Sequence, residues 1–467
     1  MRVIGEPRHF HFLGICGTAM GSVAAELRER GFSVTGSDEN IYPPMSIFLE
    51  KKGIALKEGY RAENIPADVD VVVVGNAIKR GNPEVEAVLN RKLFYLSLPE
   101  VLKNYFLRGR HNLVVTGTHG KTTTTALLAW IMEKAGHKPG YLVGGLSKNL
   151  GQGARLNRSK YFVIEGDEYD SAFFDKRSKF IHYLPELLIV NNIEFDHADI
   201  FHDLEEVKLS FRRLLNVVPQ NGMVLLNGDD RNCVEVAKDC LAQMIEVGFS
   251  ENCAQRIRDV AYSSTGSRFK LGDDNFEISL IGEFNVRNAA MAVTAARFYD
   301  VPKAKIDNAL KSFSGIARRQ EVRGEVRGVK VVDDFGHHPT AIAQTLQALR
   351  HRYPGHRLWA VFEPRSNTTR RAVFQQQLPD ALQLADGVFI AQVAKLEQIP
   401  EKERLNPEAV VDAIANSGRP AFYEESADAI VDRIVPMLQP KDVVVVFSNG
   451  GFDNIHEKLL KALGSKL

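Results

Sequence analysis

Cysteine is scarce in this sequence. Its 467 residues contain four cysteines, Cys16, Cys233, Cys240 and Cys253, and no two of them form a C-x-x-C pair. Small secreted domains held together by disulfides are rich in cysteine, and compact zinc modules use closely spaced pairs. The sequence belongs to neither class, and a reduced cytoplasmic enzyme fits it best.

The sequence also lacks long apolar runs and an excess of charge of either sign. No uncharged apolar stretch reaches the ~20 residues that a membrane-spanning helix needs, and residues 1–12 lack the apolar core of a signal peptide. The formal net charge of +1 gives no bulk attraction to nucleic acid or anionic lipid. We therefore expect no nucleic acid, no membrane and no obligate protein partner.

There is no repeat at a fixed period and no low-complexity linker, so domains must be inferred from the order of expected elements. Strands and helices alternate along most of the chain, which predicts parallel α/β architecture, and 467 residues are too many for one core. We predict a Rossmann-like domain over 1–109, a central domain of the P-loop ATPase type over 110–316, and a second Rossmann-like domain over 317–467. Hinges are expected near 108–111 and 314–319.

The stretch VVTGTHGKTTTTALLAW contains a shortened phosphate-loop motif. The common pattern is G-x-x-x-x-G-K-[ST], whereas here Gly117 begins a tighter G-x-x-G-K-T. Gly117 and Gly120 allow the backbone to approach a phosphate, and the N–H groups at the start of the following helix would face it. Lys121 would supply positive charge and Thr122 a ligand for Mg²⁺. The alternative is an ordinary glycine turn before a threonine-rich helix.

Carboxylates follow the next expected strands of the same domain. Glu165 ends YFVIE, Asp167, Glu168 and Asp170 come soon after it, and His197 follows LLIVNNIEFD. Open α/β sheets bind ligands at the carboxyl ends of their strands, and Mg²⁺ prefers oxygen ligands. An acidic loop alone is usually a solvated surface, and a lone histidine is usually structural. Together at strand ends, these residues predict a cleft for a metal ion and a nucleotide.

The N-terminal stretch GICGTAMGS places Gly14, Gly17 and Gly21 after the first expected strand, and Asp38 follows the second. This spacing is a weak dinucleotide-binding pattern, for which NAD would be the usual ligand. A diphosphate at a helix N-terminus belongs equally well to NAD or to a UDP-sugar. These residues therefore leave the ligand open.

Three motifs in order, TGTHGKTT, EGDEYD and NIEFDH, resemble the Mur ligases, the ATP-dependent amide ligases of bacterial cell-wall synthesis. That family has the shortened phosphate loop, and the resemblance covers nearly the whole chain. It implies a UDP-sugar rather than NAD in the first domain, ATP and Mg²⁺ in the central domain, and an acceptor in the third. Whether Lys208 is carbamylated, as a lysine is in some Mur ligases, stays open.

The resemblance also implies roles for individual residues. The segments GTHGKTT, LIGEFNVRNAAMAV, FSGIARRQE and DDFGHHPT imply an ATP site of Gly117, Thr118, His119, Gly120, Lys121, Thr122, Thr123, Asn285, Asn288, Arg319 and Asp334. The UDP-sugar would contact Gly14, Cys16, Gly17, Thr18, Ala19, Met20, Ser37, Asp38 and Asn76. The acceptor would contact His337, His338 and Arg365, the catalytic residues would be Lys121, Glu165 and His197, and Mg²⁺ would be held by Thr122, Glu165 and His197.

Several stretches, among them IYPPMS, FEPRSNTTRR and FSNGGFDNIHEKL, resemble one branch of the family. That branch joins L-alanyl-γ-D-glutamyl-meso-diaminopimelate to UDP-N-acetylmuramate through an acyl phosphate, in murein recycling. The alternative is the branch that adds L-alanine to the same sugar, which typically has a QPHRYTR-like segment where this chain has EPRSNTTRR. Arg365, Arg370 and Arg371 suit an acceptor with several carboxylates, although Arg370 and Arg371 could equally cap a solvated helix.

Two other classes of protein explain part of the sequence. A nicotinamide-dependent oxidoreductase would use the N-terminal glycines, but it leaves GTHGKT, Glu165 and His197 without a role. A non-catalytic nucleotide sensor would use the phosphate loop and would bind nucleotide without releasing phosphate.

Overall fold

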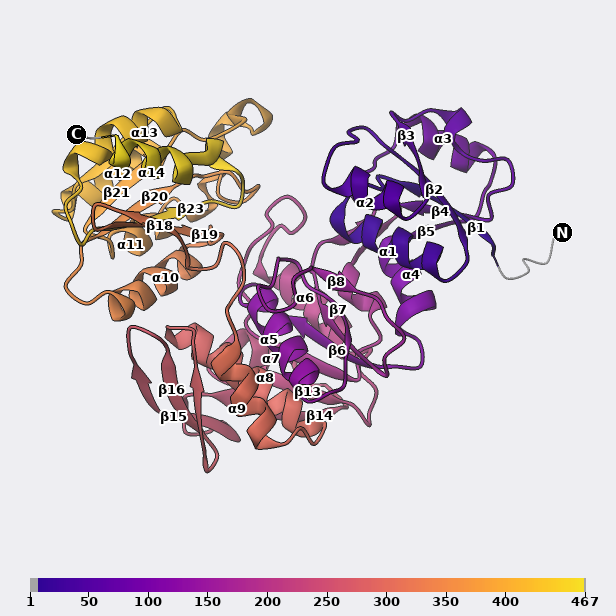
Figure 1. Cartoon of the computed structure of the whole chain (residues 1–467), viewed down its shortest axis with the longest axis horizontal. Coiled ribbons are helices and arrows are strands. Elements are labelled where there is room, and N and C mark those ends of the chain that lie inside the picture. The colour runs from indigo at the N-terminus through magenta and orange to yellow at the C-terminus, as the bar shows by residue number, and fades with distance from the viewer. Residues whose placement is uncertain (1–6, 466–467) are drawn as a thin grey trace.

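The computed structural model describes residues 7–465 and divides them into three α/β domains (Figure 1). The indigo N-terminal domain and the yellow C-terminal domain each contact the central domain, which lies between them along the chain. The predicted α/β fold class with three domains is confirmed. Within residues 7–465, no helix combines the length and the apolar character that crossing a bilayer requires.

The N-terminal domain has a five-stranded parallel sheet in the order β3-β2-β1-β4-β5. Its strands are β1 (His9–Leu13), β2 (Ser33–Asp38), β3 (Ala55–Glu58), β4 (Val71–Val74) and β5 (Tyr95–Ser97). Its helices are α1 (Thr18–Glu29), α2 (Met45–Lys51), α3 (Pro83–Asn90) and α4 (Leu98–Leu102). The strand order reverses between β1 and β4, so the turn from β1 to α1 lies at the switch point where such sheets bind ligands.

The central domain has a ten-stranded sheet in the order β17-β16-β15-β14-β13-β12-β6-β9-β7-β8. Its strands are β6 (His111–Thr116), β7 (Gly140–Leu142), β8 (Ala154–Arg155), β9 (Tyr161–Glu165), β12 (Leu187–Val190), β13 (Met223–Asn227), β14 (Gln243–Gly248), β15 (Gln255–Tyr262), β16 (Ser267–Leu271) and β17 (Asp274–Ile278). Its helices are α5 (Lys121–Lys134), α6 (Leu204–Leu215), α7 (Arg231–Val236), α8 (Glu283–Phe298) and α9 (Lys303–Ser312). A separate hairpin of β10 (Asp170–Ala172) and β11 (Asp175–Ser178) follows β9. Across the sheet, neighbouring strands pair in parallel from β7 through β9, β6, β12, β13 and β14 to β15. At the two edges, β8 pairs antiparallel with β7, and β16 and β17 extend the sheet antiparallel beyond β15.

The C-terminal domain has a six-stranded sheet in the order β18-β19-β23-β20-β21-β22, in which only the edge strand β18 is antiparallel. Its strands are β18 (Glu321–Val326), β19 (Val329–Asp334), β20 (Leu358–Phe362), β21 (Gly387–Ala391), β22 (Ala421–Glu424) and β23 (Val443–Phe447). Its helices are α10 (Pro339–Arg352), α11 (Gln377–Leu382), α12 (Pro407–Asn416), α13 (Ala427–Ile434) and α14 (Ile455–Gly464). Strands such as VVVVF in β23 are apolar throughout because helices cover both faces of the sheet.

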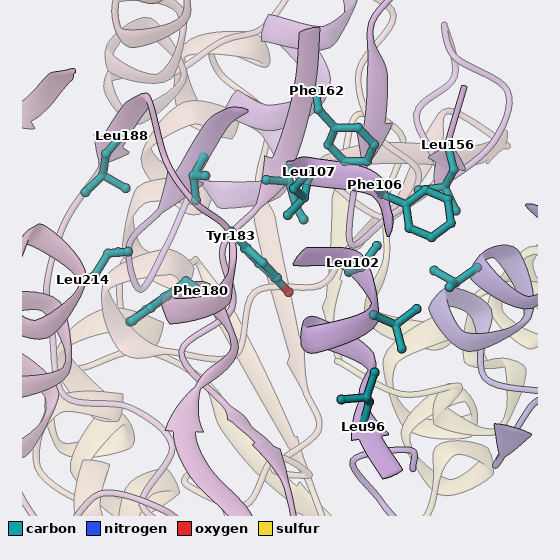
Figure 2. Packing of buried hydrophobic residues seen from close by; sticks show 14 of the residues in the cluster. Leu96, Leu102, Phe106, Leu107, Leu156, Phe162, Phe180, Tyr183, Leu188 and Leu214 are labelled. Carbon is teal, nitrogen blue, oxygen red and sulfur yellow. The ribbon is translucent and has the colours of Figure 1, made fainter. Parts of the chain in front are cut away.

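A continuous apolar cluster crosses the boundary between the first two domains. Figure 2 shows Phe106 and Leu107, at the end of the first domain, with Phe162 of β9 and Leu156 of the central domain in the same cluster. Arg30 of α1 donates hydrogen bonds to the carbonyl oxygens of Tyr105 and Leu156, at 2.7 and 2.9 Å. The expected first hinge, near residues 108–111, therefore comes immediately after residues that pack in the interface between the two domains.

Candidate active site

The phosphate-loop motif connects β6 to α5, as the motif predicts. Gly117 and Gly120 have positive φ values of 125° and 79°, a region that favours glycine. There is also no room for larger residues, because a Cβ at Gly120 would collide with Oδ1 of Asn288. The N–H of His119 is bound by Oδ1 of Asn192, at 2.7 Å. Asn192 and Asn288 therefore fix the position of the loop, and α5 starts directly after it at Lys121.

Lys121 and His197 share one carboxylate. Nζ of Lys121 lies 2.8 Å from both oxygens of Glu168, and Nε2 of His197 lies 3.0 Å from Oε1 of the same residue. Burial alone would lower the pKa of Lys121, but Glu168 more than offsets it, so the pKa is raised. Burial opposes ionisation of Glu168, yet Lys121 and His197 lower its pKa overall. The pair is therefore ionised at neutral pH.

Glu165 and Thr122 form the second half of the site. The hydroxyl of Thr122 donates to Oε1 of Glu165 at 2.9 Å, and the N–H of Gly144 donates to Oε2 at 2.7 Å. Burial raises the pKa of Glu165 in spite of these donors, and among residues 7–465 no basic side chain forms an ion pair with it. A divalent cation would reverse that shift. Two adjacent hard oxygens beside a phosphate loop fit Mg²⁺.

A cavity of about 340 Å³ extends from the phosphate loop to the C-terminal domain. Its lining includes His119, Asn227, Asp229, Arg287 and, from α10, Thr340. Asn285 and Asn288, predicted for the ATP site, lie on α8 with Arg287. Nδ2 of Asn285 donates to the carbonyl of Ile281, whereas the buried Nδ2 of Asn288 has no hydrogen-bond partner among residues 7–465. A larger cavity, of about 470 Å³, lies at the β15–β17 meander and is lined by none of the predicted site residues.

The C-terminal domain contacts the segment 194–199, which follows β12. Oγ1 of Thr340 donates to Glu194 at 2.7 Å, Oγ1 of Thr368 donates to Asp196 at 2.7 Å, and Nδ2 of Asn367 donates to Asp199 at 2.8 Å. His337 and His338, predicted to contact the acceptor, are also here. Nε2 of His337 lies 3.5 Å from Asp196, and Nδ1 of His338 lies 3.4 Å from Glu194. Together with His119, Glu194 and His338 bring three potential metal-ligand atoms within 4.8 Å of one another.

The linker between the second and third domains passes the same region. Arg319 lies over the ring of Phe335, at 5.1 Å from its centroid. The carboxylate of Asp334, predicted for the ATP site, accepts the N–H groups of Gln320 and Gly336, at 2.9 and 2.8 Å. Burial raises the pKa of Asp334. Asp334 therefore also anchors the linker. Arg365, predicted to contact the acceptor, follows the carboxyl end of β20.

The turn from β1 to α1 meets the end of β2, where the carbonyl oxygen of Ser37 accepts the N–H of Gly14 at 2.8 Å. Asp38 accepts the N–H of Cys16 at 2.9 Å, and Gly17 precedes α1. Burial, followed by the charge of Asp38, raises the pKa of the Cys16 thiol to about 11. The hydroxyl of Ser37 is fully buried and donates to Glu84 at 2.5 Å, so any contact of Ser37 with a UDP-sugar would involve its backbone. Successive side chains on a strand point to opposite faces, and Ser37 points inward.

The sequence did not single out Glu168, Glu194 or Thr368. Glu168 stands among similar carboxylates in EGDEYD, and only its position opposite Lys121 distinguishes it. Lys208, left open for carbamylation, has its amine 2.9 Å from Glu235 and 3.0 Å from Glu205. These hydrogen bonds raise its pKa, which favours the ammonium form and opposes a negatively charged carbamate beside two carboxylates.

Three family models match the chain in sequence order. They are described as the Mur ligase family, catalytic domain, over residues 9–110, the Mur ligase middle domain, over 115–296, and the Mur ligase, glutamate ligase domain, over 318–450.

Curated proteins and a solved structure match almost the whole chain. A UDP-N-acetylmuramate–L-alanyl-γ-D-glutamyl-meso-2,6-diaminoheptandioate ligase from Escherichia coli (strain K12) is 45% identical over 460 residues, which cover 98% of each chain. A UDP-N-acetylmuramate–L-alanine ligase from Acetivibrio thermocellus is 33% identical over 465 residues, 97% of this chain and 96% of that one. The crystal structure of a murein peptide ligase from Psychrobacter arcticus 273-4 aligns with a TM-score of 0.70 and 36% identity, covering 98% of this chain and 99% of the other.

Proposed function

Because this chain belongs to the Mur ligase family of ATP-dependent amide ligases, we propose that it joins L-alanyl-γ-D-glutamyl-meso-diaminopimelate to UDP-N-acetylmuramate. The observation that carries the choice of acceptor is the 45% identity, over nearly the full length, to a ligase named for that tripeptide, against 33% for a ligase named for L-alanine. The reaction would serve murein recycling and would take place in the cytoplasm, where ATP is supplied.

The first step activates the sugar acid. The lactyl carboxylate of the muramoyl group attacks the γ-phosphorus of ATP, the bond to the bridging oxygen breaks, and ADP leaves an acyl phosphate behind. Two anions must approach each other, so cationic groups and N–H donors have to offset the repulsion. Lys121 is the basic residue at the loop. A bound phosphate would replace Glu168 as the partner of the Lys121 ammonium group. Glu168 would keep its contact with His197.

The second step forms the amide bond. The neutral amine of the acceptor attacks the carbonyl carbon and loses a proton, and phosphate departs as the carbon–oxygen bond breaks. Acyl phosphates hydrolyse readily, so water must be excluded. The contacts of Thr340, Asn367 and Thr368 with the segment 194–199 support a closed arrangement of the last two domains.

Mg²⁺ fits the oxygens of Thr122 and Glu165, which adjoin the phosphate loop and are 2.9 Å apart. When bound, it would neutralise negative charge on the phosphates and on the attacking carboxylate. Glu165 would then lose the pKa elevation that burial causes. His197 would complete the set only if its ring turned from Glu168, to which it is bound at 3.0 Å.

A phosphate-release assay with acceptors from L-alanine to the tripeptide tests this proposal. With UDP-N-acetylmuramate and ATP present, we expect the tripeptide to be used far better than L-alanine, because its remote carboxylates supply binding energy that orients the amine. A preference for free L-alanine would make the alanine-adding function the correct one. Nucleotide binding without phosphate release from any acceptor would point to a non-catalytic role.

A further inference from the structure

Arg365 contacts the carboxylate of Glu363, which is itself hydrogen-bonded to Ser448. Nη1 of Arg365 lies 3.3 Å from Oε1 of Glu363, whose side chain is 9% exposed, while the arginine side chain is 48% exposed. The other oxygen of Glu363 accepts a hydrogen bond of 2.5 Å from the fully buried hydroxyl of Ser448. Glu363 therefore has little freedom, and it orients the arginine toward solvent at the carboxyl ends of β20 and β23.

Gly450 shapes the same site by having no side chain. A Cβ at this position would lie 2.7 Å from Cζ of Arg365 and closer still to its Nε and Cδ. The guanidinium group therefore lies against the backbone of Gly450. Its φ is outside the left-handed region, so the backbone would accept alanine, and the requirement for glycine is one of space alone.

Arg318, in the linker between the second and third domains, stabilises the turn formed by residues 448–450. Nη2 of Arg318 donates to the carbonyl oxygens of Ser448 and Gly450, at 2.8 and 2.7 Å. The N–H of Gly450 donates to Oγ of Ser448 at 2.9 Å, and the N–H of Ser448 donates to the carbonyl of Asp334 at 3.1 Å. An added methyl group would thus displace the flexible arginine and leave the turn in place.

We propose that Gly450, together with Glu363 and Ser448, is a positioning residue that presents Arg365 to a carboxylate of the acceptor distant from the reacting amine. A guanidinium group bonded through one edge keeps other N–H groups available for a bidentate contact with a carboxylate. The inference rests on the proposed function, because L-alanine has no carboxylate remote from its amine. It makes the 448–450 turn a determinant of acceptor specificity.

Neighbouring glycines provide a matched test. Gly450→Ala should raise the KM for the tripeptide by about tenfold or more, as expected when a charged contact is misplaced, and should leave the KM values for ATP and UDP-N-acetylmuramate unchanged. Gly451→Ala is the control, because a Cβ there meets nothing within 4 Å. Both variants should melt at the wild-type temperature. If Gly450→Ala proved unstable, Glu363→Gln would serve, since it keeps an acceptor for Ser448 and loses the charge that holds Arg365.

A double-variant cycle tests whether the effect passes through Arg365. In an Arg365→Ala background, Gly450→Ala should have no further effect on the KM for the tripeptide, because the group that it displaces is gone. A wild-type KM in Gly450→Ala, or a full effect without Arg365, would overturn the inference even if the enzyme ligates the tripeptide. Failure of the wild-type enzyme to use the tripeptide would instead overturn the proposed function.

Discussion

The ion pair between Lys121 and Glu168 is buried: 14% of the lysine side chain and 3% of the glutamate side chain are exposed. Removing one partner of such a pair leaves an uncompensated charge and costs about 3–5 kcal/mol of stability. A phosphate at the loop would compete with Glu168 for the same ammonium group. Lys121 therefore contributes to stability through one partner and, in the proposed function, to catalysis through another.

Paired variants separate these two contributions. Lys121→Ala should lower both the melting temperature and the ligation rate, the latter on the order of a hundredfold or more. Lys121→Ala combined with Glu168→Gln should recover much of the melting temperature, because no unpaired charge remains, but not the rate. Thermal melting and phosphate release on the same preparations measure both, and Glu168→Gln alone is the control. Near-normal turnover by the double variant would remove Lys121 from the mechanism.

At the scale of elements, the β10–β11 hairpin joins the loop after β9, which carries Glu168, to the first domain. It begins at Asp170, two residues after Glu168, and its tip carries Phe173 and Phe174, which pack against a buried cluster of the N-terminal domain. The rings of Phe174 and Tyr95 meet edge to face with their centroids 4.8 Å apart. The hairpin thus connects the N-terminal domain to the residues around Lys121.

Truncating Phe174 should loosen the hairpin. Loss of an aromatic pair costs about 1 kcal/mol, so Phe174→Ala should speed tryptic cleavage at Lys176 or Arg177 by about fivefold. Phe94→Ala is the matched control, because Phe94 precedes Tyr95 in the same domain but is 47% exposed. Equal cleavage rates in the two variants would show that the hairpin is held by other contacts.

At the scale of the whole molecule, the C-terminal domain makes several polar contacts with the segment 194–199 of the central domain. The stacked rings of Tyr262 and His351 and the ion pair of Lys148 with Glu321 add further contacts. Thr368 is the most buried of these donors, at 1% exposure, and its hydroxyl both donates to Asp196 and accepts the N–H of Ala198. His197 lies between these two residues, with a positive φ of 59°. The C-terminal domain therefore helps to fix the backbone of a predicted metal ligand.

Thr368→Val should favour separation of the last two domains. It keeps the shape of the side chain but leaves Asp196 without a hydroxyl donor, a loss of about 1–3 kcal/mol. Small-angle X-ray scattering should show a larger radius of gyration, and the ligation rate should fall. Thr369→Val should keep the compact shape, because the hydroxyl of Thr369 bonds to Ser366 within its own loop. An unchanged radius for Thr368→Val would mean that the remaining contacts suffice.

The sequence alone determined the features that depend on local chemistry. Alternating apolar periods indicated three α/β domains, and glycine spacing before a lysine and a threonine indicated the loop between β6 and α5. Glu165 and His197 were found because they end or follow apolar strands of one parallel sheet. These patterns can be read from the sequence alone. Positive φ values favour glycine in the loop, and ligands bind at the carboxyl ends of parallel strands, so both constrain residue type locally.

Only the tertiary structure decided which side chains meet. Glu168 and Asp167 look alike in the sequence, yet one contacts Lys121 and the other Lys179. Ser37 and Asp38 are neighbours on β2, but the first points into the core and the second binds the turn at Cys16. Gly450 and Gly451 are identical residues with different surroundings. Each difference depends on the direction of a side chain and on a partner far along the chain, and residue type and spacing encode neither.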